Sequence, residues 1–247
     1  MTKKSLLKQC TPPIVWNAVA SVKTAVRTTA RKARERDDSS RARDGSTQAL
    51  DIYWDAAMGE ALETWGEGTA WTEIRFLMAN CHGKALDIAC GTGKTMEILA
   101  PFNDLEIHGC DISDFLINKA IERGIPRERL KVCDATVTGY EDDFFDYSYS
   151  IGSMEHFTEE GVLALITEAR RITKFSSMHH LPVARNGKDN GWITPWQSYH
   201  NNSVDWWLAR FHSVYTRVHV IDSKWEDNLS VGKWFICMKD SAPALKD

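Results

Sequence analysis

The stretch LDIACGTG at residues 86–93 decides the fold. It has the pattern of an apolar strand that ends in a loop of small residues, and a helix is expected from Thr95 onward. Glycines at such a turn let the backbone approach a ligand closely, and the first turn of the following helix offers free N–H groups to it. These residues therefore predict a ligand-binding strand–turn–helix unit.

Two familiar nucleotide motifs fit this turn poorly. A triphosphate-binding loop requires G-x-x-x-x-G-K-[ST], and Ile88 occupies the position of its first glycine, although Gly93-Lys94-Thr95 supplies its end. A dinucleotide fingerprint requires a final Gly or Ala in G-x-G-x-x-G, where Met96 stands instead. The first motif is rejected, and the second is weakened because a bulky residue would push the helix off the sheet.

Short apolar strands alternate with helical stretches around this turn. Strands are expected at 85–90, 107–112, 130–133, 145–151 and 176–183, and helices at 95–99, 113–123, 158–173 and 203–211. This alternation is typical of an α/β fold with a mostly parallel sheet between two layers of helices. Strands at 217–221 and 233–238, joined by about a dozen residues without a convincing helix, favour an antiparallel pair at one edge of the sheet.

The turn at 86–93 resembles the first motif of the class I (Rossmann-like) S-adenosylmethionine-dependent methyltransferases, hydrophobic-Asp-hydrophobic-x-x-Gly-x-Gly, without a gap. The resemblance implies a doubly wound, seven-stranded sheet with an antiparallel edge strand. It also implies S-adenosylmethionine as cofactor and S-adenosylhomocysteine as product. This cofactor has no phosphate, so no phosphate-binding lysine is needed, and Asp87 can meet its ammonium group.

The residues at the ends of the later strands match the family's cofactor-binding positions in the same order along the chain. Asp111 ends the second strand, where an acid can take both ribose hydroxyls, and Asp134 ends the third strand, where the resemblance places it toward the adenine amino group. Tyr53 and Trp54 are expected to cover the cofactor. The full set of expected cofactor contacts is Tyr53, Trp54, Asp87, Ala89, Gly91, Thr92, Gly93, Asp111, Ile112, Asp134, Ala135 and Ile151.

The loop after the fourth strand resembles that of sugar O-methyltransferases. In that family a histidine there often takes the acceptor's proton, which points to His156, with Glu155 as its partner and His180 as a further catalytic candidate. The expected reaction is O-methylation of a sugar or glycan, at a hydroxyl or terminal phosphate, in surface-polysaccharide biosynthesis. N-methylation of a small molecule and a non-catalytic cofactor-binding scaffold stay open as alternatives.

Residues 185–207 are interpreted as an acceptor-binding insertion, because indole rings alternate there with amides and acids. Such a mixture suits a sugar, which stacks its C–H face and binds through its hydroxyls. The expected acceptor contacts are Arg185, Trp192, Trp196, Tyr199, His200 and Asn201. Trp206 and Trp207 are interpreted instead as anchors of a helix on the sheet.

The chain divides by charge into a basic arm, residues 1–50, and an acidic body, residues 51–247. The arm holds eleven Lys and Arg against four acids, a balance of +7, so the body carries −11 of the total of −4. An acidic body disfavours nucleic acid as partner. Four valines at helical spacing, Val15 to Val26, predict a helical extension. It is expected to pack on its own domain or on a second subunit, or to lie on a membrane surface, where a lipid-linked glycan would be within reach.

Other features of the composition concern cofactors and compartment. The six cysteines form no C-x-x-C pair, so reduced thiols are expected rather than disulfides or zinc. No pair of carboxylates or His/Asp cluster has the spacing of a metal-dependent O-methyltransferase, and no metal is expected. Neither a signal peptide nor a membrane span is recognised in the sequence, so the protein is expected to be soluble and cytoplasmic, with peripheral contact at the inner face of the membrane.

Overall fold

The computed structural model describes residues 62–102, 104–194 and 198–239. These residues belong to one compact unit that spans Leu50–Asp247. Several predictions concern residues outside the described part: the expected helical extension at 1–50, Tyr53, Trp54 and Trp196. The interpretations given to them stay predictions.

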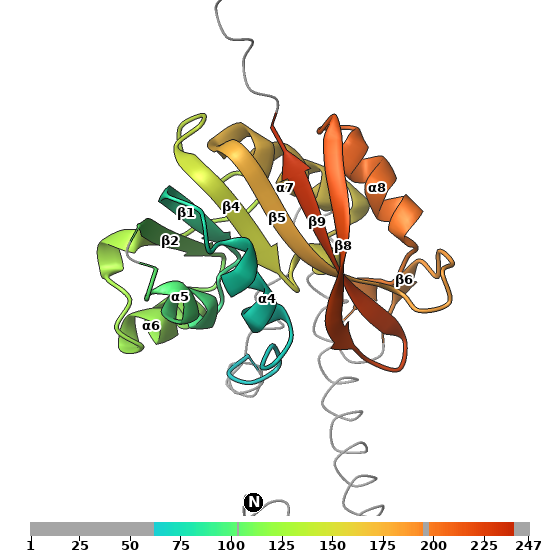
Figure 1. Cartoon of the computed structure of the whole chain (residues 1–247), viewed down its shortest axis with the longest axis horizontal. Coiled ribbons are helices and arrows are strands. Elements are labelled where there is room, and N and C mark those ends of the chain that lie inside the picture. The colour runs from blue at the N-terminus through green and yellow to red at the C-terminus, as the bar shows by residue number, and fades with distance from the viewer. Residues whose placement is uncertain (1–61, 103, 195–197, 240–247) are drawn as a thin grey trace, which may run out of the picture. The chain divides into compact units, whose positions relative to one another are not determined.

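A seven-stranded sheet forms the centre of the unit, in the order β3-β2-β1-β4-β5-β9-β8 (Figure 1). Its strands are β1 (Gly83–Ile88), β2 (Leu105–Asp111), β3 (Leu130–Val132), β4 (Phe145–Ile151), β5 (Thr173–Ala184), β8 (Arg217–Glu226) and β9 (Ser230–Met238). β1 to β5 pair in parallel, whereas β9 runs antiparallel to both β5 and β8. The expected doubly wound, mostly parallel sheet with an antiparallel pair at one edge is confirmed.

The strand order changes direction at β1, whose two neighbours are β2 and β4. The chain therefore winds outward from β1 on both sides, and the loops that follow β1 and β4 diverge. In open sheets of this kind, ligands bind in the crevice at the carboxyl ends of the strands where the order reverses. The topology thus places the 86–93 turn at the position where a ligand is expected.

Helices cover both faces of the sheet. They are α4 (Ala70–Leu77), α5 (Lys94–Leu99), α6 (Asp114–Glu122), α7 (Glu159–Ile172) and α8 (Val204–His212), with 3-10 turns η3 (Arg127–Arg129) and η4 (Met154–His156). Figure 1 shows α4 in front of the sheet, and α7 and α8 behind it. Ser113, Thr158 and Ser203 cap α6, α7 and α8 through their hydroxyl oxygens, as short hydroxyl side chains do at helix N-termini.

Each face of the sheet has its own apolar core. On one face, Trp207 and Phe211 of α8 pack with Phe145 and Phe235, and all four side chains are buried. On the other face, Ile74 of α4 packs in a cluster that includes Met96, Tyr149 and Trp234. The interpretation of Trp207 as an anchor for its helix is confirmed, since its side chain is fully buried.

Several boundaries differ from those expected. α7 ends at Ile172 and β5 starts at Thr173, so no loop separates them. β8 continues to Glu226 and β9 starts at Ser230, so residues 227–229 alone connect them, instead of about a dozen residues. The added part of β8 was missed because most of its side chains are exposed, which removes the apolar alternation by which a strand is recognised. A small hairpin, β6 (Trp192–Ile193) with β7 (Tyr199–His200), lies within the expected loop.

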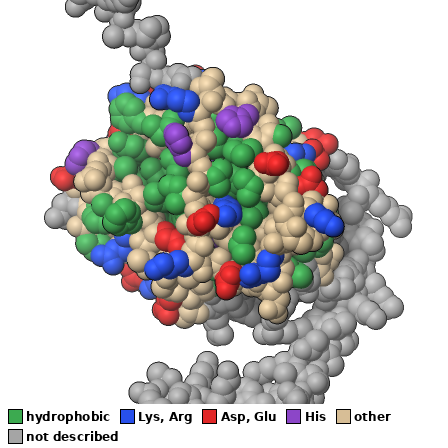
Figure 2. Space-filling model, turned by 45° about the vertical axis from the view of Figure 1, so that its right-hand side comes forward, with side chains coloured by type: hydrophobic (Ala, Val, Ile, Leu, Met, Phe, Trp, Pro, Cys, Tyr) green, Lys and Arg blue, Asp and Glu red, His purple; other side chains and the backbone are tan. Residues whose placement is uncertain are grey.

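The surface of the described part mixes apolar and charged side chains, as Figure 2 shows for one face. β8 ends the sheet, and its exposed side chains include Asp222, Lys224 and Glu226. Charges on an edge strand disfavour pairing with other chains. Among the described helices, none combines the length and the apolar character that crossing a membrane requires. The five cysteines of the described part are free thiols.

Candidate cofactor and acceptor site

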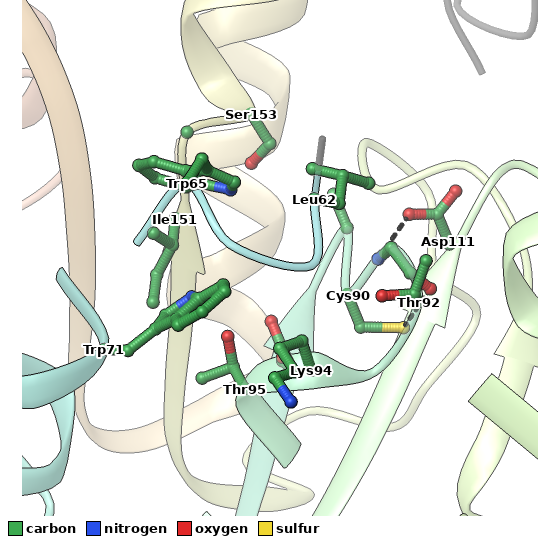
Figure 3. A pocket seen from close by; sticks show the side chains of 14 residues that line it. Leu62, Trp65, Trp71, Cys90, Thr92, Lys94, Thr95, Asp111, Ile151 and Ser153 are labelled. Atoms are coloured by element: carbon green, nitrogen blue, oxygen red, sulfur yellow. Dashed lines mark hydrogen bonds between the residues drawn. The ribbon is translucent and has the colours of Figure 1, made fainter. Parts of the chain in front are cut away.

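A pocket lies at the carboxyl ends of β1, β2 and β4 (Figure 3). Its floor is the turn after β1, and its walls include Trp65 and Trp71 on one side and Asp111 on the other. The expected cofactor residues that line it are Asp87, Ala89, Gly91, Thr92, Asp111 and Ile151. The structure therefore brings together in one pocket residues from three separate strand ends.

The turn after β1 is held open by its backbone conformation. Ala89, Gly91 and Gly93 have φ values of 58°, 55° and 71°, in the left-handed region. Glycine adopts this region without penalty, whereas alanine is strained there. The Gly91 N–H donates to Asp111 Oδ2 at 2.9 Å, so the second strand braces the turn of the first.

Asp111 is buried, and both of its carboxylate oxygens are used. Oδ1 accepts from the Ser113 N–H at 2.9 Å and Oδ2 accepts from Gly91. Burial raises the pKa of Asp111, and the backbone N–H donors counteract part of that rise. Each carboxylate oxygen can accept a further hydrogen bond, so the side chain can still receive hydroxyl groups from the pocket.

Asp87 is the least satisfied acid in the pocket. Its side chain is 3% exposed, and Oδ2 has no hydrogen-bond partner in the described part of the chain. Burial raises the pKa of Asp87 well above its ordinary value; the Tyr149 hydroxyl offsets part of this, and the charge of Asp111 adds to it. A buried, unpaired carboxylate oxygen is costly. It therefore fits a ligand that brings a cationic donor, as the ammonium group of S-adenosylmethionine does.

Four other expected cofactor residues, all within the described part of the chain, do not line the pocket. Gly93 caps the N-terminus of α5, and Ile112 and Ala135 pack in the core against α7 and α8. Asp134 is exposed, and its Oδ1 accepts from the N–H and hydroxyl of Thr136 at 2.8 and 2.7 Å. Their roles toward the cofactor stay predictions.

Other lining residues were missed by the sequence reasoning. They are Leu62, Trp65, Trp71, Cys90, Lys94, Thr95, Gly152 and Ser153. The concentration of aromatic residues before the first strand was the available signal for Trp65 and Trp71. The loop of Gly152 and Ser153 was recognised as a family motif, but its own contribution to the pocket was not.

The loop after β4 places Glu155 and His156 in η4, which follows Ser153 of the pocket; neither residue lines the pocket itself. The His156 Nδ1 lies 2.8 Å from the carbonyl oxygen of Ser198. A carbonyl can only accept, so Nδ1 carries the proton and Nε2 keeps its lone pair. Burial lowers the pKa of His156, and the bond to Ser198 raises it by less. The ring is therefore neutral at pH 7 and can accept a proton at Nε2.

Glu155 is buried beside this ring. Its Oε1 lies 3.9 Å from His156 Nε2, and its Oε2 has no hydrogen-bond partner among the described residues. Burial raises the pKa of Glu155 to about 8. Glu155 is therefore mostly a neutral carboxylic acid at pH 7, able to donate a hydrogen bond.

His179 and His180 point to opposite faces of β5. The ring of His180 lies 6.2 Å from that of Trp65, and its Nε2 is 3.0 Å from Ser223 Oγ. Burial lowers the pKa of His180 to about 4. His179 instead stacks on Phe211, in the core on the other face. Of the two, His180 is on the side of the pocket, but it lies behind Trp65 and does not line the pocket.

The 185–207 segment leaves the carboxyl end of β5 and returns to η4, where Ser198 meets His156. Trp192 is 46% exposed and packs edge-on against His200. Tyr199 and Asn201 are buried, and both bond to the Ser230 hydroxyl. The side chain of Arg185 pairs with Glu226 at the surface. Trp192 is thus the expected acceptor residue with the largest free surface among those described.

Metal chemistry has no evident ligand set here. Throughout residues 62–102, 104–194 and 198–239, no group of three or more His, Cys, Asp or Glu side chains is arranged to hold a metal ion. The expectation that the reaction needs no metal stays a prediction.

Comparison with known proteins identifies the domain that carries the pocket. Residues 85–175 match a family model described as a methyltransferase domain. This segment is therefore similar to a methyltransferase domain. This match covers the segment from β1 to the start of β5, and with it the turn, Asp111 and η4.

Two kinds of curated relative match parts of this domain. The "probable tRNA methyltransferase 9B" of Mus musculus is 34% identical over 109 residues, which cover 43% of this chain and 23% of the relative. Phosphoethanolamine N-methyltransferase 1 of Triticum aestivum is 32% identical over 83 residues, covering 32% of this chain and 17% of the relative. The chain thus spans less than a quarter of the length of these relatives.

Solved structures confirm the fold over a longer stretch. Phosphoethanolamine N-methyltransferase 2 of Haemonchus contortus, in complex with S-adenosyl-L-methionine, matches with a TM-score of 0.55 at 16% identity, covering 68% of this chain and 52% of that one. A "putative methyltransferase" in a complex with the Haloferax volcanii activator Trm112 matches with a TM-score of 0.59 at 13% identity, covering 78% and 98%. The expected class I methyltransferase fold is confirmed, whereas the resemblance to sugar O-methyltransferases finds no support in these names.

Proposed function

We propose that this protein transfers a methyl group from S-adenosylmethionine to a hydroxyl group of a sugar or glycan. The observation that carries the proposal is the pocket at the end of β1, where the buried Asp87 oxygen without a partner and the braced Gly91 turn lie together. The methyltransferase domain supports the choice of cofactor, as does the S-adenosyl-L-methionine bound in the similar Haemonchus contortus structure.

Different residues of the pocket bind different groups of this cofactor. Asp87 pairs with the ammonium group, and Asp111 accepts hydrogen bonds from ribose hydroxyls while it braces the turn. Trp65, Trp71 and Ile151 form an apolar wall that excludes water. When bound, the cofactor supplies a methyl group activated by the positive sulfur.

Transfer to a hydroxyl requires removal of the hydroxyl proton. His156 is arranged for this, because the bond from Nδ1–H to the Ser198 carbonyl leaves the Nε2 lone pair free. As the acceptor oxygen bonds to the methyl carbon, its proton passes to Nε2, and the Ser198 carbonyl stabilises the ring cation. Glu155 lies beside the ring, with Oε1 3.9 Å from Nε2, and as a neutral acid it keeps its own proton in this step.

The 185–207 segment supports a sugar as the acceptor. It starts at the carboxyl end of β5, the same edge of the sheet as the pocket, and it presents the exposed Trp192 among the exposed polar side chains of residues 186–190. An indole face with neighbouring amides suits the stacking and hydrogen bonding of a sugar ring. A lipid-linked glycan, and a role in surface-polysaccharide biosynthesis at the inner face of the membrane, extend this proposal.

A second candidate is N-methylation of a small amine. It is favoured by the match to phosphoethanolamine N-methyltransferase of Triticum aestivum. A neutral amine is already nucleophilic, so methyl transfer to it needs no strong base. Replacement of His156 would then have little effect on kcat. The tRNA methyltransferase match suggests RNA, but the net charge of −11 on residues 51–247 opposes binding to a polyanion.

One assay separates these candidates. Purified protein is incubated with labelled S-adenosylmethionine and, in parallel, with fractionated envelope glycans, small phosphorylated amines and tRNA. We expect label in a glycan fraction, and a loss of kcat of about a hundredfold or more for His156→Gln, the usual size of a general-base effect. His219→Gln, an exposed histidine on β8, is the matched control.

The outcomes have distinct meanings. Label in an amine with full activity of His156→Gln would establish the second candidate. Binding of the cofactor without label in any fraction would favour the non-catalytic scaffold.

A further inference from the structure

A short segment, residues 62–65, crosses the pocket and is called the strap here. Leu62 and Trp65 both line the pocket and lie at opposite ends of the strap (Figure 3). A methyl group added to Gly91 would lie 3.3 Å from Leu62 Cδ1, and one added to Gly152 would lie 3.2 Å from the Trp65 ring. The strap therefore contacts both the turn after β1 and the loop after β4, and spans the pocket between them.

One carboxylate ties the strap to the rest of the domain. Glu63 Oε1 accepts from the Thr92 hydroxyl at 2.9 Å and from Arg123 Nη2. Arg123 Nε in turn donates to the Thr92 carbonyl at 2.9 Å. This three-residue latch joins the strap to the turn after β1 and to the C-terminal end of α6.

The latch is charged and partly exposed. Burial raises the pKa of Glu63, but the bonds from Arg123 and Thr92 outweigh this and hold the pKa below its ordinary value. The Glu63 side chain is 38% exposed and that of Arg123 13%. A bond of this kind can break and reform in water at moderate cost. Glu63 does not line the pocket, so it acts on a ligand only through the strap and through Thr92.

We infer that Glu63 is a positioning residue that holds the strap closed over the cofactor and thereby sets the rate at which cofactor and product leave. The inference rests on the proposed function, because it takes the occupant of the pocket to be S-adenosylmethionine or S-adenosylhomocysteine. Trp65 and Trp71 face the occupant from the strap and from α4. Loss of the latch frees the strap without removing a pocket side chain.

The test compares Glu63→Gln with Glu97→Gln. Glutamine keeps the size of the side chain but removes its charge. Glu97 Oε2 also accepts from Arg123, at 2.9 Å from Nη1, but it has no contact with the strap. Release of S-adenosylhomocysteine is followed by stopped-flow tryptophan fluorescence, since Trp65 and Trp71 report on the pocket. We expect release about tenfold faster in Glu63→Gln, the effect of a partly exposed charged hydrogen bond.

Further readouts separate this role from a purely structural one. Added salt should accelerate release from the wild type and from Glu97→Gln, and have little effect on Glu63→Gln. Under turnover, Glu63→Gln should raise KM for the cofactor without lowering kcat, while its Tm stays within a few degrees of the control.

The inference is overturned if both variants release the product at the wild-type rate, or if Glu63→Gln loses kcat and Tm together. If instead the wild type binds neither S-adenosylmethionine nor S-adenosylhomocysteine, the proposed function itself fails and the inference with it.

Discussion

Replacement of Glu155 by glutamine should make the protein more stable at alkaline pH. The side chain is buried, and burial raises its pKa to about 8 from the ordinary 4.5. The folded protein therefore holds a proton there that the unfolded chain has lost between these two values. The contribution of Glu155 to the free energy of unfolding is therefore largest below pH 4.5, and it decreases as the pH rises toward 8. Glutamine has the same shape and does not titrate. The free energy of unfolding of Glu155→Gln should therefore not show this decrease with pH.

The size of the effect follows from the two pKa values. At about 1.4 kcal/mol for each pH unit, the interval from 4.5 to about 8 corresponds to ~5 kcal/mol as an upper bound. Water that enters when the carboxylate ionises reduces this value, and we expect about 2–4 kcal/mol at pH 9. His179 and His180, whose pKa values burial lowers to about 3 and about 4, reduce stability below pH 6.5. They are present in both proteins and cancel in the difference.

The assay is urea unfolding followed by tryptophan fluorescence, at intervals from pH 5 to pH 9. Glu155→Gln should match the wild type within about 1 kcal/mol at pH 5 and exceed it by about 2–4 kcal/mol at pH 9. Glu160→Gln, an exposed glutamate at the start of α7, is the control and should show a constant difference. A parallel pH dependence of Glu155→Gln and wild type would refute the burial of a neutral acid next to His156.

Two further predictions concern strain and packing. Ala89→Gly should stabilise the protein by about 0.5–1 kcal/mol in thermal unfolding, because relief of the left-handed conformation exceeds the entropy that glycine adds to the unfolded chain; destabilisation would show that the alanine methyl group is needed. Trp192→Ala should change stability by less than about 0.5 kcal/mol yet raise KM for a glycan, whereas Trp207→Ala should cost about 3–5 kcal/mol. An equal loss of stability in the two variants would contradict the exposure of Trp192 and the burial of Trp207.

The fold could be predicted because the signals that define it are local. The strands β1 and β2 are short, mainly apolar runs, and hydroxyl caps such as Ser113, Thr158 and Ser203 mark where three helices begin. The end of β8 could not be predicted in the same way. Asp222 and Glu226 pair with Lys233 and Val231 of β9 at an exposed edge, with an irregular register between them. Backbone pairing of this kind leaves no apolar pattern in the sequence.

The site could be predicted only in part, and for a related reason. Asp87, Gly91 and Asp111 end neighbouring parallel strands, so the topology alone brings them together. The strap depends on tertiary contacts instead. Glu63 meets Arg123 from 60 positions away, and neither residue belongs to a recognisable motif. Asp134 shows a different limit: it lies beyond the end of β3 at Val132, and Thr136 occupies one of its carboxylate oxygens.

Isothermal titration with S-adenosylhomocysteine, on the wild type and on Asp111→Ala, tests most directly whether the turn after β1 binds the cofactor. Asp114→Asn, an exposed acid three residues further on, is the control, and Tm values verify folding. We expect saturable binding by the wild type and the control, and a loss of affinity of about thirtyfold or more in Asp111→Ala, as removal of charged hydrogen bonds implies. Equal affinities in all three proteins, or no binding by the wild type, would contradict the account.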